Sequence, residues 1–229
     1  MSRRLSLIAI VLALACGAAG AAEDYSPAER LVFMSDHLGN VKPPATLGYT
    51  FRKSGALEDG FSDRVSIAVD QHADGSCCES HGEFLSGARR IELPDVGQPR
   101  GNPVILFFLE HDVRDMQRLT HGQQAHFRRM IRTALYKEAQ VRDTTLRYRD
   151  REVQGKEVSI EPYLNDAQRN RFEKFSRKRY VFLFSDAVPG GVYGIRSSMR
   201  AENVDAPPLI VEEMYIDGAQ PPAPAGPHS

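Results

Sequence analysis

The sequence has no tryptophan, only three cysteines, and no excess of charge of either sign. Its 29 lysines and arginines nearly balance 30 aspartates and glutamates, so the formal net charge is −1. This balance gives the chain no general attraction to nucleic acid. Beyond the first 22 residues no stretch is apolar for long enough to span a bilayer, so we expect no membrane-spanning helix there.

Several motifs that carry chemistry are also missing. The sequence contains no Walker motif, no GxSxG elbow, no HExxH zinc motif and no GxGxxG nucleotide loop. A hydrolase built on His111 or His121 therefore stays a reserve hypothesis. We expect no cofactor, and we favour a protein without enzymatic activity.

The first 22 residues have the pattern of a secretory signal peptide. Arg3 and Arg4 precede an apolar stretch over residues 5–15, and small residues follow over residues 17–22. Cleavage after residue 21 or 22 and a periplasmic location are expected. A lipoprotein anchored through Cys16 is the alternative, and it fits less well because Leu14 stands two residues before the cysteine instead of three.

The rest of the chain has the composition of a folded domain, since 41 % of the residues are hydrophobic and 26 % are charged. We expect one α+β domain over residues 23–216. Residues 217–229 are rich in proline, alanine and glycine, and are expected to form a disordered tail.

The first half of the domain has the pattern of strands. In residues 46–53, Leu47, Tyr49 and Phe51 alternate with small or polar residues, and residues 63–69 repeat this alternation. Links that contain glycine separate the two stretches, as in an antiparallel meander. Further strands are expected around residues 78–85 and at residues 89–93.

The second half begins with a helix. Asn102 and Pro103 are typical of a helix start, and an apolar stripe then runs to Thr120. Residues 123–137 fit either a helix or a strand. The apolar stripe of the helix that runs to Thr120 consists of Leu106, Leu109, Val113, Met116 and Leu119.

The remaining elements are mostly strands. A hairpin turn is expected at residues 154–156, between strands at 145–150 and 157–162. An amphipathic helix is expected at 166–179, and further strands at 180–184, 192–199 and 208–216.

This order of elements predicts a curved antiparallel β-sheet, a half-barrel-like meander, packed on one or two helices. With its phrases GNPVILFFLEHDVRDMQRLT and YVFLFSDAVPGGVY, the chain resembles uncharacterised exported proteins of Gram-negative bacteria. Its architecture is also similar to the lipoprotein-carrier half-barrels, in which a sheet wraps a helix around an apolar cavity. Neither resemblance places a functional residue.

The most reactive stretch lies at residues 72–81. It gathers His72, Cys77, Cys78 and His81, a ligand set suited to zinc or copper, although the spacing matches no known structural zinc site. After signal cleavage only Cys77 and Cys78 remain, so an internal disulfide would join adjacent residues. Free thiols, a vicinal disulfide and a metal site all stay open.

Charged residues cluster in two other places. Glu110, His111 and Asp112 look catalytic, but Glu110 can pair with Arg114, and His111 with Asp115, as a salt-bridge row on one helix face. Arginines and lysines recur at residues 128–132, 147–151 and 169–179, with Arg147, Arg149 and Arg151 expected on one strand face. We expect nearby acidic residues, including Asp166 and Glu173, to neutralise them.

These observations favour an exported, non-enzymatic binding or scaffold protein of the cell envelope. Its partner would be a lipid, an amphipathic ligand or an envelope protein. The alternative is a redox or metal-binding protein that uses Cys77 and Cys78 with His72 and His81. The side chains expected to line a ligand cavity, or else to fill a solid core, are Tyr49, Phe51, Phe107, Leu109, Val113, Phe182 and Phe184.

Overall fold

The computed structural model describes residues 25–72, 77–91, 94–201, 203 and 206–222. They form one antiparallel nine-stranded sheet in the order β4-β3-β2-β1-β9-β8-β7-β6-β5. Because the last strand pairs with the first, β9 joins the two halves of the sheet. The strands are β1 (Ala45–Ser54), β2 (Phe61–Gln71), β3 (Cys77–Phe84), β4 (Val96–Gly97), β5 (Gln140–Tyr148), β6 (Arg151–Ile160), β7 (Lys178–Phe184), β8 (Val192–Met199) and β9 (Ile210–Ile216).

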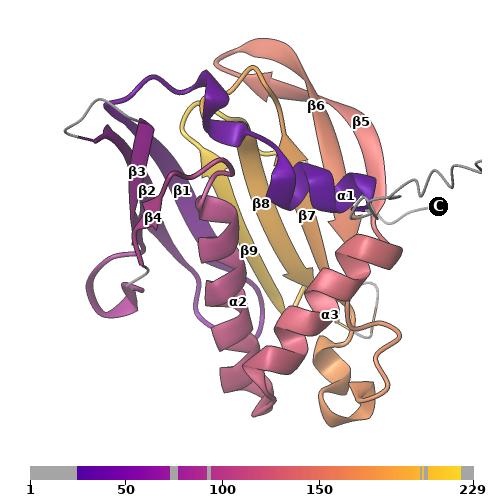
Figure 1. Cartoon of the computed structure of the whole chain (residues 1–229). Helices are drawn as coiled ribbons and strands as arrows, with labels where there is room; N and C mark the ends of the chain where they lie inside the picture. The colour runs from indigo at the N-terminus through magenta and orange to yellow at the C-terminus, as the bar shows by residue number, and fades with distance from the viewer. Residues whose placement is uncertain (1–24, 73–76, 92–93, 202, 204–205, 223–229) are drawn as a thin grey trace, which may run out of the picture.

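The helices lie on one side of this curved sheet (Figure 1). Two long helices, α2 (Val104–Thr120) and α3 (Gln124–Lys137), sit on the concave face. The short α1 (Pro27–Glu29) and the π-helical turn η1 (Arg30–Met34) lie above α3 on the same side of the sheet. The predicted α+β class with a curved antiparallel sheet is confirmed. In the described part of the chain, no helix is long and apolar enough to cross a membrane.

Alternation along the strands decides which side chains enter the core. In β1 the side chains of Leu47, Tyr49 and Phe51 are buried, and in β2 those of Val65 and Ile67 are buried. Side chains of this parity point to the same face of a sheet, so they meet the helices in one apolar core. The last buried position of this series in β1 is Lys53.

The start of α2 agrees with the prediction, because the Asn102 side chain accepts a hydrogen bond from the Val104 N–H at 3.1 Å. The predicted stripe is wrong at one position: Leu106 is 51 % exposed. Instead, the Phe107 ring packs against Gly82 of β3. A Cβ atom at residue 82 would lie only 1.9 Å from that ring. Phe107, and not Leu106, therefore faces the core in the first turn of α2.

The predicted hairpin turn at residues 154–156 is wrong. The turn between β5 and β6 is formed by Arg149 and Asp150, which have φ angles of 46° and 63°. Paired left-handed residues are the geometry of a tight two-residue hairpin. Gly155 instead lies inside β6, where a Cβ would meet the Leu146 side chain at 2.6 Å. Arg147, Arg149 and Arg151 therefore do not share one strand face.

Two other predicted elements are also wrong. Residues 166–179 do not form an amphipathic helix; they contain two 3-10 turns, η4 (Arg169–Arg171) and η5 (Glu173–Phe175), before β7 begins. The inward direction of Phe172 and Phe175 is nevertheless confirmed. The expected strand at residues 89–93 is replaced by the 3-10 turn η3 (Gly87–Arg89) and a single bridge from Ile91 to Phe84, and residues 92 and 93 lie outside the described residues.

The chain stays on the sheet beyond the predicted start of its tail. Asp217 pairs with Arg64 at 2.6 Å, Ala219 forms a bridge with Tyr148, and the Gln220 N–H donates to the Arg147 carbonyl. The expectation that disorder begins at Asp217 is corrected by these contacts. The predicted signal peptide and residues 223–229 lie outside the described residues.

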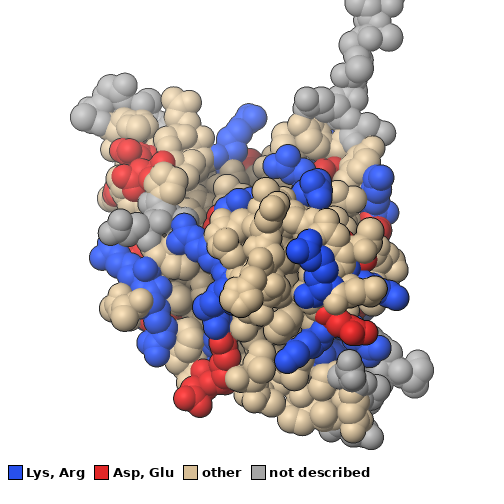
Figure 2. Space-filling view, turned by 90° about the horizontal axis from the view of Figure 1, so that it is seen from below, with Lys and Arg blue, Asp and Glu red and all other residues tan. Residues whose placement is uncertain are grey.

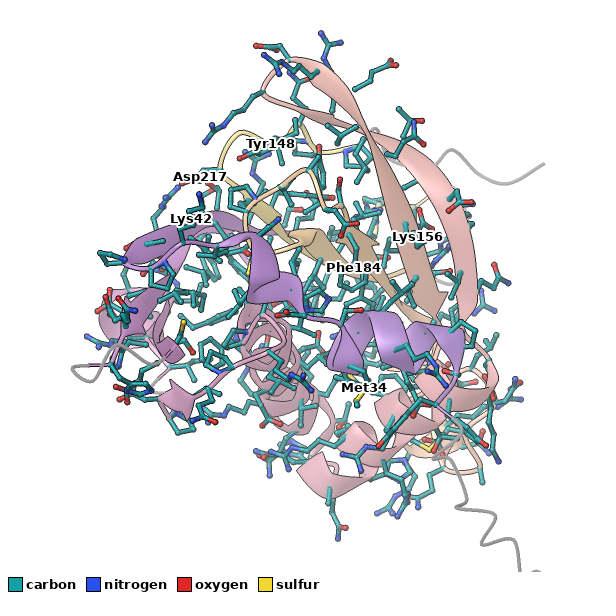
Figure 3. The ribbon with its side chains drawn as sticks, turned by 45° about the horizontal axis from the view of Figure 1, so that its top comes forward. Met34, Lys42, Tyr148, Lys156, Phe184 and Asp217 are labelled. Atoms are coloured by element: carbon teal, nitrogen blue, oxygen red, sulfur yellow. The ribbon has the colours of Figure 1, made fainter. Side chains whose placement is uncertain are left out.

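The segment after η1 is fixed to the sheet by His37, which begins the 3-10 turn η2 (His37–Asn40). Its ring stacks on Phe184 with centroids 5.3 Å apart, and Figure 3 shows this segment running past Phe184. Its Nδ1 accepts the Asn102 N–H, while Nε2 lies 2.8 Å from the Leu31 carbonyl. These contacts require the neutral imidazole.

We therefore expect acid to weaken the fold through His37. Burial lowers the pKa of His37 below its usual value of 6.5, although the Leu31 carbonyl, Asp36 and Asp186 act in the opposite direction. The unfolded chain then binds a proton near pH 6.5 that the folded chain rejects, so stability falls as the pH drops below about 6.5. Urea unfolding from pH 7.5 to 5 should show this slope, at most about 1.4 kcal/mol per pH unit. His37→Gln should flatten it, and an unchanged slope in that variant would exclude His37 as the cause.

Candidate functional site

A row of polar side chains crosses the centre of the concave face. Lys53 on β1 is the register partner of Glu212 on β9, Glu212 pairs with Ser197 on β8, and Ser197 pairs with Tyr180 on β7. Register partners point to the same face of an antiparallel sheet. All of these side chains are buried. The sheet therefore presents a polar strip in the middle of an apolar surface.

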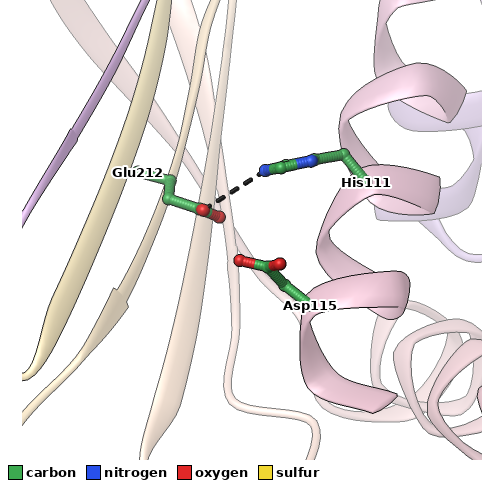
Figure 4. A group of neighbouring side chains, drawn as sticks. All are labelled: His111, Asp115 and Glu212. Carbon is green, nitrogen blue, oxygen red and sulfur yellow. Dashed lines mark hydrogen bonds and ion pairs between the residues drawn. The ribbon is translucent and has the colours of Figure 1, made fainter. Parts of the chain in front are cut away.

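Helix α2 places charged groups opposite this strip. His111 and Asp115 are four residues apart and so lie on the same helix face. Nε2 of His111 is 3.2 Å from Oε1 of Glu212, and Nζ of Lys53 is 2.6 Å from Oδ2 of Asp115 and 3.1 Å from Oε1 of Glu212. Figure 4 shows the side chains of His111, Asp115 and Glu212 converging between helix α2 and strand β9.

A second ion pair lies beside the first. Asp112, the residue after His111, contacts the ammonium group of Lys178 and accepts a 2.5 Å hydrogen bond from the Tyr180 hydroxyl. The Tyr163 hydroxyl lies 3.2 Å from that of Tyr180 and extends the chain of polar contacts. Burial raises the pKa of both tyrosines well above the usual value, so they stay protonated hydrogen-bond donors.

The central charges are held in fixed states. Burial opposes the charge of Lys53, but Glu212 and Asp115 outweigh it and raise the lysine pKa. Burial likewise opposes the charge of Glu212, but His111, Lys178 and Lys53 lower its pKa overall. The group therefore holds an ammonium and a carboxylate in contact, which suits binding and positioning more than proton transfer.

The predicted lining residues surround this strip. All of them are buried, and they contact one another in a single core. The Phe51 ring packs edge-on against His111 with centroids 5.4 Å apart, so the apolar lining and the charged group touch. That a ligand lies among these side chains stays a prediction. The lining consists of Tyr49, Phe51, Phe107, Leu109, Val113, Phe182 and Phe184.

The predicted cysteine–histidine site is not assembled by the described residues. Cys78 is buried and takes part in a disulfide, for which the sequence offers Cys16 and Cys77 as partners. His81 points to the other face of β3, where it lies 2.9 Å from Asp95. His72 follows the end of β2 and is half-buried.

The expected neutralisation of the basic clusters is only partly correct. Glu110 pairs with Arg128 of α3 at 2.7 Å, and not with Arg114 as predicted. Asp166 is buried and lies 2.6 Å from His126, so it does not face the basic side chains that follow it. Figure 2 shows lysine and arginine spread over this lower end of the molecule. The exposed basic residues of this segment are Arg169, Arg171, Lys174 and Arg177.

Sequence reasoning missed most of the charged group beneath α2. One signal was present, since Lys53 continues the inward alternation of Leu47, Tyr49 and Phe51. Nothing in the sequence indicated that Lys53 meets Glu212, because β1 and β9 are neighbours in the sheet but lie near opposite ends of the sequence.

No protein-family model matches the chain, and no curated protein matches it. Among solved structures, the crystal structure of the lipoprotein LppX of Mycobacterium tuberculosis is similar over 88 % of this chain and 100 % of that chain. The sequence identity is 8 % and the TM-score is 0.36, a similarity too low to bear on function.

Proposed function

We propose that this chain is an exported binding protein that holds an apolar or amphipathic ligand between its curved sheet and the helices on the concave face. One observation carries the proposal. Helix α2 covers an apolar sheet surface, but buried ion pairs join it to that surface at Lys53, Lys178 and Glu212.

Stability alone does not favour this arrangement. Replacing a buried ion pair by apolar side chains of similar volume is often neutral or stabilising, because removing charges from water is costly. A buried ion pair offsets the cost of removing its charges from water only when its geometry is good, so these contacts reward one position of α2 on the sheet. A helix attached in this way is suited to cover a ligand and to release it.

The surroundings of the site indicate the class of ligand. The lining is aromatic and aliphatic, which fits an apolar body. Ser197 adds a buried hydroxyl that has no hydrogen-bond partner in the described part of the chain. A single polar group on an otherwise apolar molecule would complete it.

The location is part of the proposal. The basic, apolar and small-residue order of residues 1–22 supports export to the periplasm, with anchoring through Cys16 as the alternative. A redox or metal role for Cys77 and Cys78 with His72 and His81 is less well supported, because Cys78 and His81 lie on opposite faces of β3.

Two substitutions on α2 test the binding proposal. Leu109 is 8 % exposed and faces the core, whereas Leu106 is 51 % exposed on the same helix. Leu109→Gln should weaken binding of the apolar fluorophore 1-N-phenylnaphthylamine roughly tenfold, since a buried leucine contributes ~1.5–3 kcal/mol. Leu106→Gln should leave it unchanged.

The measurement is a fluorescence titration of the full chain, with far-ultraviolet circular dichroism to check that each variant is folded. The proposal expects saturable binding of one probe per chain in the unsubstituted protein. Probe binding that is absent from that protein, or equal in the two folded variants, would contradict the proposal.

A further inference from the structure

We propose that His111, Asp115 and Glu212 form a site for one Zn²⁺ ion, with Lys53 as a built-in competitor for it. Among the described residues, these three are the group whose ligand atoms converge, all within 4.8 Å of one another. The site differs from the one expected at the cysteines, and it does not depend on the proposed ligand.

The geometry is close to what zinc requires. Zinc bonds of ~2.0–2.1 Å at tetrahedral angles place two ligand atoms about 3.3 Å apart. Nε2 of His111 and Oε1 of Glu212 are already 3.2 Å apart. The ligand atom of Asp115 lies within 4.8 Å of the other two, so it completes the set after a shift of at most about 1.5 Å, and water would take the fourth position.

An unpaired acceptor supports a cation at this place. Oε2 of Glu212 is buried and has no hydrogen-bond partner among the described residues. The other oxygen, Oε1, already contacts His111 and Lys53. A buried carboxylate oxygen without a donor is costly, and a metal ion would satisfy it.

The charge balance agrees with this assignment. Glu58, Asp115 and Glu212 carry three negative charges, and Lys53 and Arg118 carry two positive charges. The carboxylates of this group therefore outnumber its lysine and arginine side chains by one. The mixed nitrogen and oxygen donors favour Zn²⁺ over Mg²⁺ or Ca²⁺, which prefer oxygen ligands alone.

Lys53 holds the place of the ion. Its ammonium group contacts Asp115 and Glu212, and also Glu58 at 2.9 Å. When zinc binds, Lys53 can leave the first two carboxylates and keep Glu58, which is more exposed. Because His111 and Asp115 belong to α2 and Glu212 to β9, the ion would fasten the helix to the sheet.

The test uses the full chain, stripped of metal with a chelator and dialysed against Zn²⁺, with metal analysis and thermal unfolding as readouts. We expect one Zn²⁺ per chain and a rise in Tm with Zn²⁺ but not with Mg²⁺. Asp115→Asn, at a partly exposed ligand, should weaken binding roughly tenfold or more. Lys53→Met should bind Zn²⁺ more tightly, and the stability that it loses should return when Zn²⁺ is added.

Two controls separate this site from others. His81→Ala removes the exposed histidine beside Asp95 and should leave the stoichiometry at one. The double variant Cys77→Ser, Cys78→Ser should do the same. Loss of the ion in either control, equal affinity in the unsubstituted chain and Asp115→Asn, or no zinc binding by the unsubstituted chain would overturn the assignment.

Discussion

Replacing Lys178 by methionine is expected to lower the free energy of unfolding by about 3–5 kcal/mol. The methionine fills a similar volume but leaves the buried carboxylate of Asp112 with the Tyr180 hydroxyl and no cation. Burial raises the pKa of Asp112, and Lys178 is the main group that opposes this shift. Urea unfolding at pH 7 measures the loss.

A matched control lies nearby in the chain. Lys174 is exposed in η5, so Lys174→Met should change stability by less than about 0.5 kcal/mol. Adding Asp112→Asn to Lys178→Met should recover much of the loss, because the second change removes the unpaired charge. The ion pair would not have the role assigned to it if Lys178→Met cost no more than Lys174→Met.

The second large effect is expected at Asn102, where three parts of the fold meet. Its Nδ2 donates to the Tyr49 hydroxyl at 2.8 Å and to the Gly190 carbonyl at 2.9 Å, and its Oδ1 accepts the Val104 N–H. Asn102→Ala removes these bonds and leaves buried partners unsatisfied, so it should cost about 3 kcal/mol.

The same unfolding measurement applies, with Asn170→Ala in the exposed turn η4 as the control. We expect the control to lie within about 0.5 kcal/mol of the unsubstituted chain. If Asn102→Ala differed from the control by less than that amount, the junction of β1, α2 and the loop before β8 would not depend on this side chain.

Local patterns predicted much of the sheet. The alternation of Leu47, Tyr49 and Phe51 located β1 to within one residue at each end, and the Asn102-Pro103 pair located the start of α2. The hairpin turn was missed because Arg149 and Asp150 adopt left-handed angles that glycine usually provides, while Gly155 is small for a packing reason.

Long-range contacts decided what the local patterns could not. The helical pattern of residues 166–179 gives way to turns in a segment where His126 binds Asp166 and where Phe172 packs on Phe127. The charged group beneath α2 combines residues from β1, α2, β7 and β9, and only the order of the sheet brings them together. The spacing of these residues along the sequence does not indicate the order of the strands in the sheet.

Native mass spectrometry of the chain purified from its own host tests the central claim, that a ligand lies between sheet and helices. The account predicts an adduct of lipid-like mass, bound one per chain, that disappears on denaturation. The denatured mass should correspond to cleavage after residue 21 or 22. A chain that carries no adduct under native conditions, and takes up no lipid when its host's lipid extract is added, would contradict the account and favour an envelope scaffold.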